Sequence, residues 1–234
     1  MITIDGSQGE GGGQMLRSSL ALSIVTGQEV CISKIRAKRR KPGLMRQHLT
    51  CVKAAAEICQ AEVEGAELNS REVTFHPGPV TGGEYAFRIG TAGSTGLVLQ
   101  TVLPALLNAE TPSRVTFEGG THNPMAPPFD FLDRAFLPLI NRLGPTATIR
   151  LERPGFYPAG GGLVELTVEP SKTLGPLKLV ERGKLVERRC RALLAHLPNH
   201  IGDRECRAIV RSLQWPDSCT EVEQFDEARC PGNA

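Results

Sequence analysis

The sequence lacks the features that mark membrane-spanning, secreted and zinc-binding proteins. No apolar run approaches the roughly 20 residues that a membrane-spanning helix needs. Residues 1–5 have neither the basic start nor the long apolar core of a signal peptide, and they are expected to form a strand. The seven cysteines are an odd number without a Cys-x-x-Cys pair, which argues against a disulfide framework or a structural zinc site. Since cysteines such as Cys51 and Cys59 are expected to be buried thiols, we predict a cytoplasmic protein that does not bind membranes.

Two common nucleotide-binding motifs are also missing. The Gly-Lys pair at 183–184 is followed by leucine, whereas a Walker A loop has serine or threonine there. Gly9 and Gly11 begin the dinucleotide-binding pattern, but Gln14 stands where its third glycine belongs. The 234 residues are 40% hydrophobic and 22% charged, which predicts an ordinary globular protein with one large domain or two small ones.

What the sequence does have is a glycine-rich start. Five glycines fall within residues 6–13, and an apolar helical pattern follows at once. Glycine lets a ligand approach the main chain closely, and a helix N-terminus attracts anions such as phosphate. Glu10 and Arg17 add one charge of each sign. The residues alone leave two alternatives open: a phosphate or nucleotide site, and a tight strand-to-helix turn without a ligand.

A basic segment follows the first predicted helix. Residues 34–46 include seven lysines and arginines and no acidic residue. Such a run can be a solvated loop, but this one connects an alternating strand to an amphipathic helix, where sites tend to be built. Clustered lysine and arginine are typical of proteins that bind nucleic acids, so we favour a polyanion-binding role.

The elements expected along the chain occur twice in the same order. The first set is a helix over 14–26, a strand over 30–35, a helix opened by Pro42-Gly43 with an apolar stripe over 45–59, and strands near 63, 73–75 and 85–89. The second set is a glycine turn over 90–96, a helix over 97–109, a strand over 114–118, a helix over 131–143, and strands over 149–151 and 164–168. Gln100 takes the place of Arg17 in the second set, and Pro124 takes the place of Pro42.

We therefore predict an α/β (α+β) fold class, with tandem repeated units that each combine glycine-turn helices and a small sheet. The two units are placed at about 1–89 and 90–170. Beyond them we expect a connection over 171–183, a strand over 184–190, a helix over 203–213 and a polar, turn-like end over 226–234.

Several of these segments together resemble the RNA 3′-terminal phosphate cyclases. The matching stretches are 5–14, 35–39, 41–44, 46–48, 99–101, 123–128 and 155–162. The resemblance covers residues 1–183, and residues from Leu185 onward resemble the opening of the family's inserted small domain. It implies a cyclase core over 1–183, a partial inserted domain over 184–234, and the absence of a third core repeat.

The resemblance implies an ATP-dependent enzyme that converts an RNA 3′-phosphate end into a 2′,3′-cyclic phosphate through enzyme-AMP and RNA-adenylate intermediates, with a divalent cation (Mg or Mn). By matching positions, Glu10 would hold the metal. The residues that would line the phosphate and RNA-end site are Arg17, Arg36, Arg39 and Gln47. Gln100 would contact ATP, with Pro127 and Phe131 close to the adenine, although Phe131 is equally well explained as a core residue.

This chain differs from the family pattern at the nucleophilic residue. In these cyclases the histidine that carries AMP lies in a later unit, after the inserted domain. None of the five histidines of this chain is expected to replace it: His48, His76, His122, His196 and His200. We therefore expect a truncated cyclase without a nucleophile, and an exposed apolar face that favours dimerisation or poor solubility. Two alternatives remain open, a non-catalytic RNA-binding relative and, with less support, an enolpyruvyl transferase.

Overall fold

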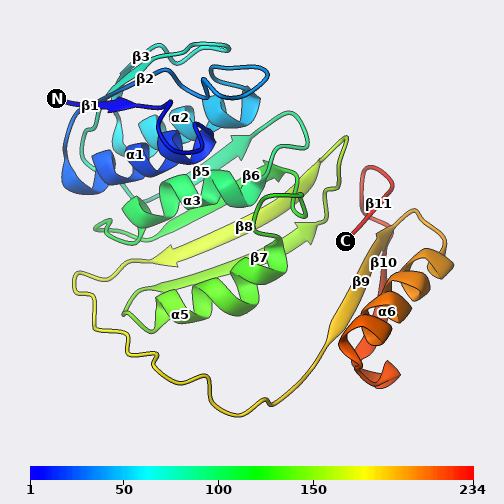
Figure 1. The fold of residues 1–234 in the computed structure, drawn as a ribbon. Helices are drawn as coiled ribbons and strands as arrows, with labels where there is room; N and C mark the ends of the chain where they lie inside the picture. The colour runs from blue at the N-terminus through cyan, green and yellow to red at the C-terminus, as the bar shows by residue number, and fades with distance from the viewer.

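The computed structural model describes residues 1–234 as a mixed α/β protein with three small sheets (Figure 1). The first sheet has the order β1-β2-β4-β3. Its strands are β1 (Ile2–Asp5), β2 (Val30–Ser33), β3 (Glu62–Glu64) and β4 (Val73–His76). β1 runs parallel to β2, while β4 is antiparallel to both of its neighbours.

Two helices belong to this first part of the chain, α1 (Gly13–Thr26) and α2 (Arg46–Cys59). Each ends at a residue in the left-handed conformation, Gly27 for α1 and Gln60 for α2, which turns the chain away from the helix axis. The predicted helix over 14–26 is confirmed. The second helix begins at Arg46 and not at Pro42-Gly43, because the proline and the positive φ of Gly43 keep the end of the basic segment irregular.

The second sheet repeats the topology of the first, in the order β5-β6-β8-β7. Its strands are β5 (Glu84–Arg88), β6 (Ser113–Gly119), β7 (Thr146–Arg153) and β8 (Gly162–Glu169). β5 is parallel to β6, and β8 is antiparallel to β6 and β7. The strand over 84–88, which the sequence assigned to the end of the first unit, therefore pairs in the second sheet, where it corresponds to β1.

The helices of this second part differ more from expectation. α3 (Thr95–Leu106) begins at Ser94, whose hydroxyl accepts a hydrogen bond of 3.3 Å from the Leu97 N–H. The single helix expected over 131–143 is instead α4 (Phe129–Phe131), the π-helical turn η1 (Leu132–Phe136) and α5 (Leu137–Asn141). Pro138 has no N–H to donate to the carbonyl four residues earlier, and the π-helical turn η1 comes just before it.

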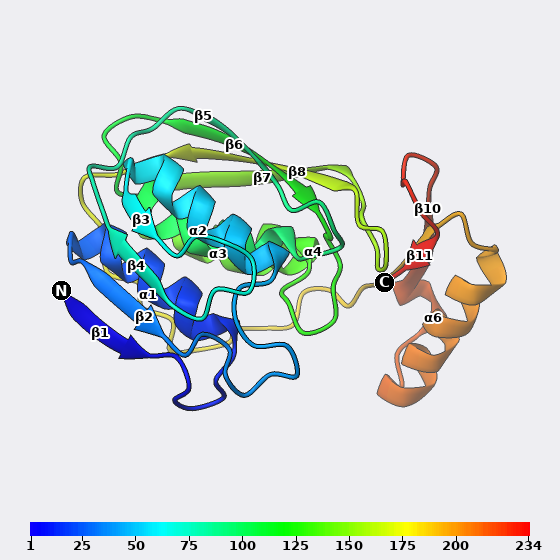
Figure 2. The ribbon, with the colours of Figure 1, turned by 90° about the horizontal axis from the view of Figure 1, so that it is seen from above.

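Figure 2 shows α1, α2 and α3 in one layer between the two four-stranded sheets. A single cluster of 32 buried apolar residues runs through this arrangement, from Leu16 and Leu20 of α1 to Phe117 of β6 and Leu166 of β8. The two parts of the chain therefore share one hydrophobic core. Cys51 and Cys59 are fully buried free thiols, as predicted.

The C-terminal part forms a third sheet beside the main body (Figures 1 and 2). It contains β9 (Cys190–Ala195), α6 (Asn199–Leu213), a short 3-10 turn η2 (Asp217–Cys219), β10 (Thr220–Phe225) and β11 (Gly232–Asn233). The order is β10-β9-β11, with β10 parallel and β11 antiparallel to β9. A separate cluster of five buried residues lies beneath it.

One prediction for this part is wrong. The strand expected over 184–190 begins only at Cys190, because Leu185 and Val186 are exposed and the buried run 192–195 forms the strand instead. The turn-like end is confirmed over 226–231, and it is followed by the short strand β11. The helix over 203–213 is confirmed within the longer α6. No helix in the protein combines the length and the apolar character that crossing a bilayer requires.

Candidate anion-binding site

The first turns of α1, α2 and α3 meet at one place. A Cβ atom placed on Gly13, the first residue of α1, would lie 2.4 Å from Nε2 of His48 in the first turn of α2. The side chain of Gln47, also in α2, accepts a hydrogen bond of 2.7 Å from the backbone N–H of Ser94, which caps α3. Three helix N-termini are therefore in contact through two adjacent residues of α2.

Two of the three helix N-termini at this meeting point lack a side-chain cap. Neither Gly12 before α1 nor Met45 before α2 provides a side-chain cap, and none of the three helices has an acidic residue in its first turn. Helix N-termini expose unpaired N–H groups and the positive end of the helix dipole. The geometry therefore favours an anion.

Arg17 adds a buried charge to the same place. Its side chain is in α1 with only 7% of the residue exposed, and its Nη1 would lie 2.9 Å from a Cβ on Gly13. Its hydrogen bonds go to neutral groups, from Nε to Gln100 Oε1 at 3.2 Å and from Nη2 to Gln14 Oε1 at 2.8 Å. Burial lowers the pKa of Arg17, and no carboxylate opposes that effect. Because arginine stays charged in proteins, the guanidinium is a buried cation without a counter-ion.

The basic segment (residues 34–46) folds onto the glycine loop (residues 5–13), and Figure 2 shows both at the same end of the first sheet. Lys38 Nζ donates a hydrogen bond of 2.8 Å to the carbonyl of Gly9, and the Lys38 side chain lies against Gly11. The guanidinium of Arg39 lies against Gly12, 2.8 Å from where a Cβ would stand. The absence of side chains at these glycines is what lets the cations approach the loop.

Arg36 shapes the basic segment from within. Its Nη1 donates hydrogen bonds to the carbonyls of Lys41 at 2.7 Å and Gly43 at 2.8 Å, and burial lowers its pKa. Arg36 itself has a φ of +54°, a left-handed conformation that is uncommon outside glycine and often marks functional sites. One guanidinium nitrogen of Arg36 thus stabilises the fold of the segment, and the charge of Arg36 helps to lower the pKa of His48.

Glu10 is paired with Arg39, and its side chain is largely exposed. No group of three or more histidine, cysteine, aspartate or glutamate side chains in the protein could hold a metal ion by itself. Magnesium is commonly bound by one or two carboxylates together with substrate phosphates, and a single exposed carboxylate next to an anion site fits that kind of binding. Glu10 would have to leave Arg39 to take part in it.

Of the two residues expected near the adenine, Pro127 lies beside α3. The carbonyl oxygen of Pro127 is 3.0 Å from where a Cβ on Gly96 would stand. Phe131 is 48% exposed, so the alternative that it is a core residue is wrong. Its ring stacks on Phe136 with the centroids 6.4 Å apart. Phe136 in turn lines an apolar groove of about 500 Å³ that has Arg17 and Gln100 in its wall.

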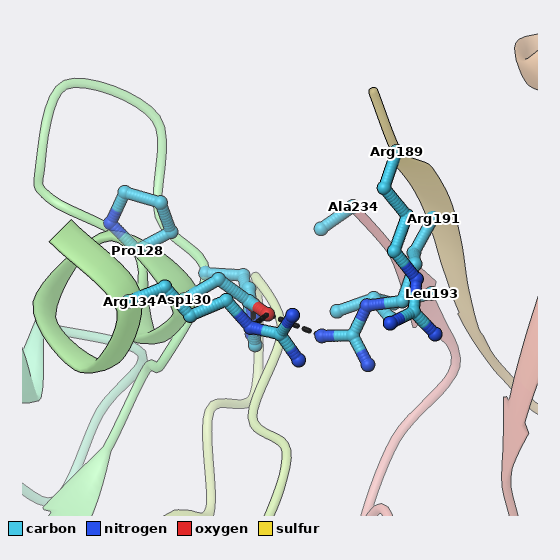
Figure 3. A pocket seen from close by; sticks show the side chains of 8 residues that line it. Pro128, Asp130, Arg134, Arg189, Arg191, Leu193 and Ala234 are labelled. Atoms are coloured by element: carbon cyan, nitrogen blue, oxygen red, sulfur yellow. Dashed lines mark hydrogen bonds and ion pairs between the residues drawn. The ribbon is translucent and has the colours of Figure 1, made fainter. Parts of the chain in front are cut away.

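A second polar cluster joins the main body to the third sheet (Figure 3). Asp130 of α4 forms an ion pair with Arg191 of β9 and accepts a hydrogen bond of 3.1 Å from Nε2 of the buried His122. The His122 hydrogen bond, and then the charge of Arg191, lower the pKa of Asp130 to about 2. The cluster lines a cavity of about 380 Å³ whose cationic side chains already have acidic partners. We therefore interpret this cluster as a structural contact between the main body and the third sheet.

His48, in the first turn of α2, also lies where the helix N-termini meet. Its side chain is partly buried and its Nδ1 has no hydrogen-bond partner, a partial burial that was not predicted from the sequence. The helical pattern contains the signal, because His48 falls on the same face as the buried Val52, Ala55 and Cys59.

Comparison with known proteins gives a consistent result. A family model described as RNA 3′-terminal phosphate cyclase matches residues 8–227 of the chain. A curated relative, the RNA 3′-terminal phosphate cyclase of Koribacter versatilis (strain Ellin345), is 55% identical over 234 residues. That alignment covers all of this chain and 66% of the relative, so the chain spans slightly less than two thirds of the relative's length.

Proposed function

Because the chain belongs to the RNA 3′-terminal phosphate cyclase family, we propose that it takes part in the ATP-dependent conversion of an RNA 3′-phosphate end into a 2′,3′-cyclic phosphate. In this reaction AMP is transferred from ATP to the enzyme, with release of pyrophosphate, and then to the RNA 3′-phosphate. The neighbouring 2′-hydroxyl displaces AMP and closes the cyclic phosphate. The family match favours this function over the enolpyruvyl transferase alternative.

One observation supports the proposal most directly: the buried, unpaired charge of Arg17 lies where three helix N-termini meet. This place is suited to a phosphate group, because the anion would supply the negative charge that no protein side chain provides for Arg17. We assign phosphate and RNA-end binding to Arg17, Arg36, Arg39 and Gln47. We assign ATP binding to Gln100, Pro127 and Phe131, and metal binding to Glu10. A divalent cation, when bound, would neutralise developing phosphate charge.

We also propose that the two four-stranded sheets with their helices are copies of one duplicated unit. Their identical strand orders and strand directions support this. We assign residues 184–234 to the beginning of an inserted small domain. A cytoplasmic location remains a prediction.

The test of the proposed function is selective binding of a phosphorylated RNA end. We expect the protein to bind a short 3′-phosphorylated oligoribonucleotide more tightly than the same RNA with a 3′-hydroxyl, because only the phosphate offers the extra charge. Fluorescence polarisation with end-matched RNAs measures this. The double variant Arg36→Gln/Arg39→Gln should lose the preference, because forked guanidiniums match phosphate oxygens. Equal binding of the two RNAs by the unaltered protein would rule out an end-specific site.

A separate prediction concerns catalysis by the 234-residue polypeptide alone. We expect no covalent adenylate, because none of its five histidines matches the nucleophile of the family. Incubation with α-labelled ATP and Mg or Mn, followed by denaturing electrophoresis, should show no labelled band. A band that is removed by acid and by His48→Phe would contradict this prediction. A labelled band would also exclude a non-catalytic RNA-binding relative, whereas its absence is expected both for such a relative and for a cyclase chain without the nucleophile.

A further inference from the structure

Two free cysteines of the C-terminal part, Cys190 in β9 and Cys206 in α6, come together between the strand and the helix, and neither belongs to the anion site. We propose that Cys190 and Cys206 are a redox-sensitive modification site, at which exchange with a small-molecule disulfide such as oxidised glutathione joins them in a disulfide. This inference does not depend on RNA or ATP binding.

Cys190 lies on the side of β9 that α6 covers. Alternate residues of a strand point to the same side, so Cys190 shares its side with Ala192 and Leu194. A Cβ atom on Gly202 of α6 would lie 3.2 Å from Cδ1 of Leu194, which identifies this side as the one under the helix. Leu193, on the opposite side, belongs instead to the cluster of five buried residues.

Cys206 lies on the face of α6 that covers the sheet. Gly202 and Cys206 are one helical turn apart, and they are the buried residues of this helix. The thiol of Cys206 donates a hydrogen bond of 3.6 Å to the carbonyl oxygen of Glu221 in β10. Thr220, the residue before Glu221, is paired with Cys190 in the parallel ladder. Cys206 therefore reaches the sheet next to Cys190.

The surroundings of the two thiols determine which one reacts first. Cys190 is partly exposed, whereas Cys206 is only 5% exposed, so a disulfide from solution meets Cys190. Burial, and then the neighbouring Cys206 thiol, raise the pKa of Cys190. Because the thiolate is the attacking form, exchange at Cys190 should be slow at neutral pH and should need hours of incubation.

The modification consists of two exchange steps. The Cys190 thiolate attacks one sulfur of oxidised glutathione, forms a mixed disulfide and releases one glutathione thiolate. The Cys206 thiolate then attacks the Cys190 sulfur and releases the second glutathione thiolate. The two cysteines give up two protons and two electrons, and one molecule of oxidised glutathione is reduced to two of glutathione. The product closes the loop of residues 190–206 and holds the start of β9 against α6.

The experiment identifies the linked peptides in the full chain after incubation with oxidised glutathione. A tryptic digest without reductant should contain peptide 190–191 joined to peptide 205–207, and mass spectrometry detects this product. The melting temperature should rise by several degrees, because closing a loop restricts the unfolded chain. Dithiothreitol should reverse both changes.

Single substitutions separate the two steps. Cys206→Ser should stop at the mixed disulfide on Cys190, and Cys190→Ser should leave the buried Cys206 unmodified. Cys219→Ser is the matched control, because Cys219 is also partly exposed and is close to Cys190 along the ladder, yet its loss should change neither readout. A glutathione adduct that persists on Cys190 of the unaltered protein, a link between Cys190 and Cys219, or an unmodified Cys190 would each overturn the inference.

Discussion

Replacing Arg17 by methionine is expected to weaken binding of a 3′-phosphorylated RNA end by about 100-fold, since a guanidinium can make two charge-assisted hydrogen bonds to one phosphate. Methionine keeps the length and the apolar packing of the side chain in α1. The buried charge has no carboxylate partner whose loss would leave a second charge unpaired. The free energy of unfolding should therefore stay the same or increase, because a costly buried cation has been removed.

Arg211→Met is the matched control for this variant. Arg211 is exposed in the last turn of α6, far along the chain from the anion site, and its replacement changes the net charge by the same amount. For both variants, RNA binding is measured by fluorescence polarisation and stability by thermal melts. The comparison separates a local effect at the anion site from a general loss of positive charge. If Arg17→Met binds the phosphorylated RNA as the unaltered protein does, the buried guanidinium is not the phosphate ligand and the site assignment is wrong.

Much of the fold could be predicted because the helices and strands have clear hydrophobic periods. The apolar spacing after the glycine loop predicted α1 to within one residue at its start. The failures have local causes. Leu185 and Val186 look like a strand but are exposed, because a strand also needs a partner, which the sequence alone does not identify. The π-helical turn before α5 was not predicted because the apolar stripe continues through it, and a proline alone does not indicate such a turn, since Pro104 lies within α3.

The site was predicted as a set of residues but not as an arrangement. Arg17 and Gln100 were recognised as equivalent positions in two successive units, yet their side chains are joined by a direct hydrogen bond. This contact exists because α1 packs against α3, and the sequence gives no information on how two such helices are placed. The hydrogen bond between Gln47 and Ser94 was not predicted for the same reason. It brings the N-terminus of α3 to the site.

Gly13 is where this arrangement can be tested most directly. A methyl group at position 13 would meet the ends of two side chains, Nε2 of His48 and Nη1 of Arg17, and no backbone atom is among its nearest contacts. Gly13→Ala should therefore move His48 and Arg17, of which Arg17 is assigned to phosphate binding, and leave the chain fold in place. Alanine also has a higher helix propensity than glycine by about 1 kcal/mol, which offsets part of the crowding.

We expect Gly13→Ala to bind the 3′-phosphorylated RNA about 100-fold more weakly, because it displaces the guanidinium of Arg17, which can make two charge-assisted hydrogen bonds to one phosphate. Gly175→Ala is the control, since a methyl group there would have its nearest neighbour at 3.8 Å. In a His48→Ala background, Gly13→Ala should no longer lower the melting temperature, because the atom it crowds most has been removed. A double-mutant cycle on thermal stability measures this coupling. Additive effects of the two substitutions, or normal RNA binding by Gly13→Ala, would show that α1 and α2 do not form one phosphate site.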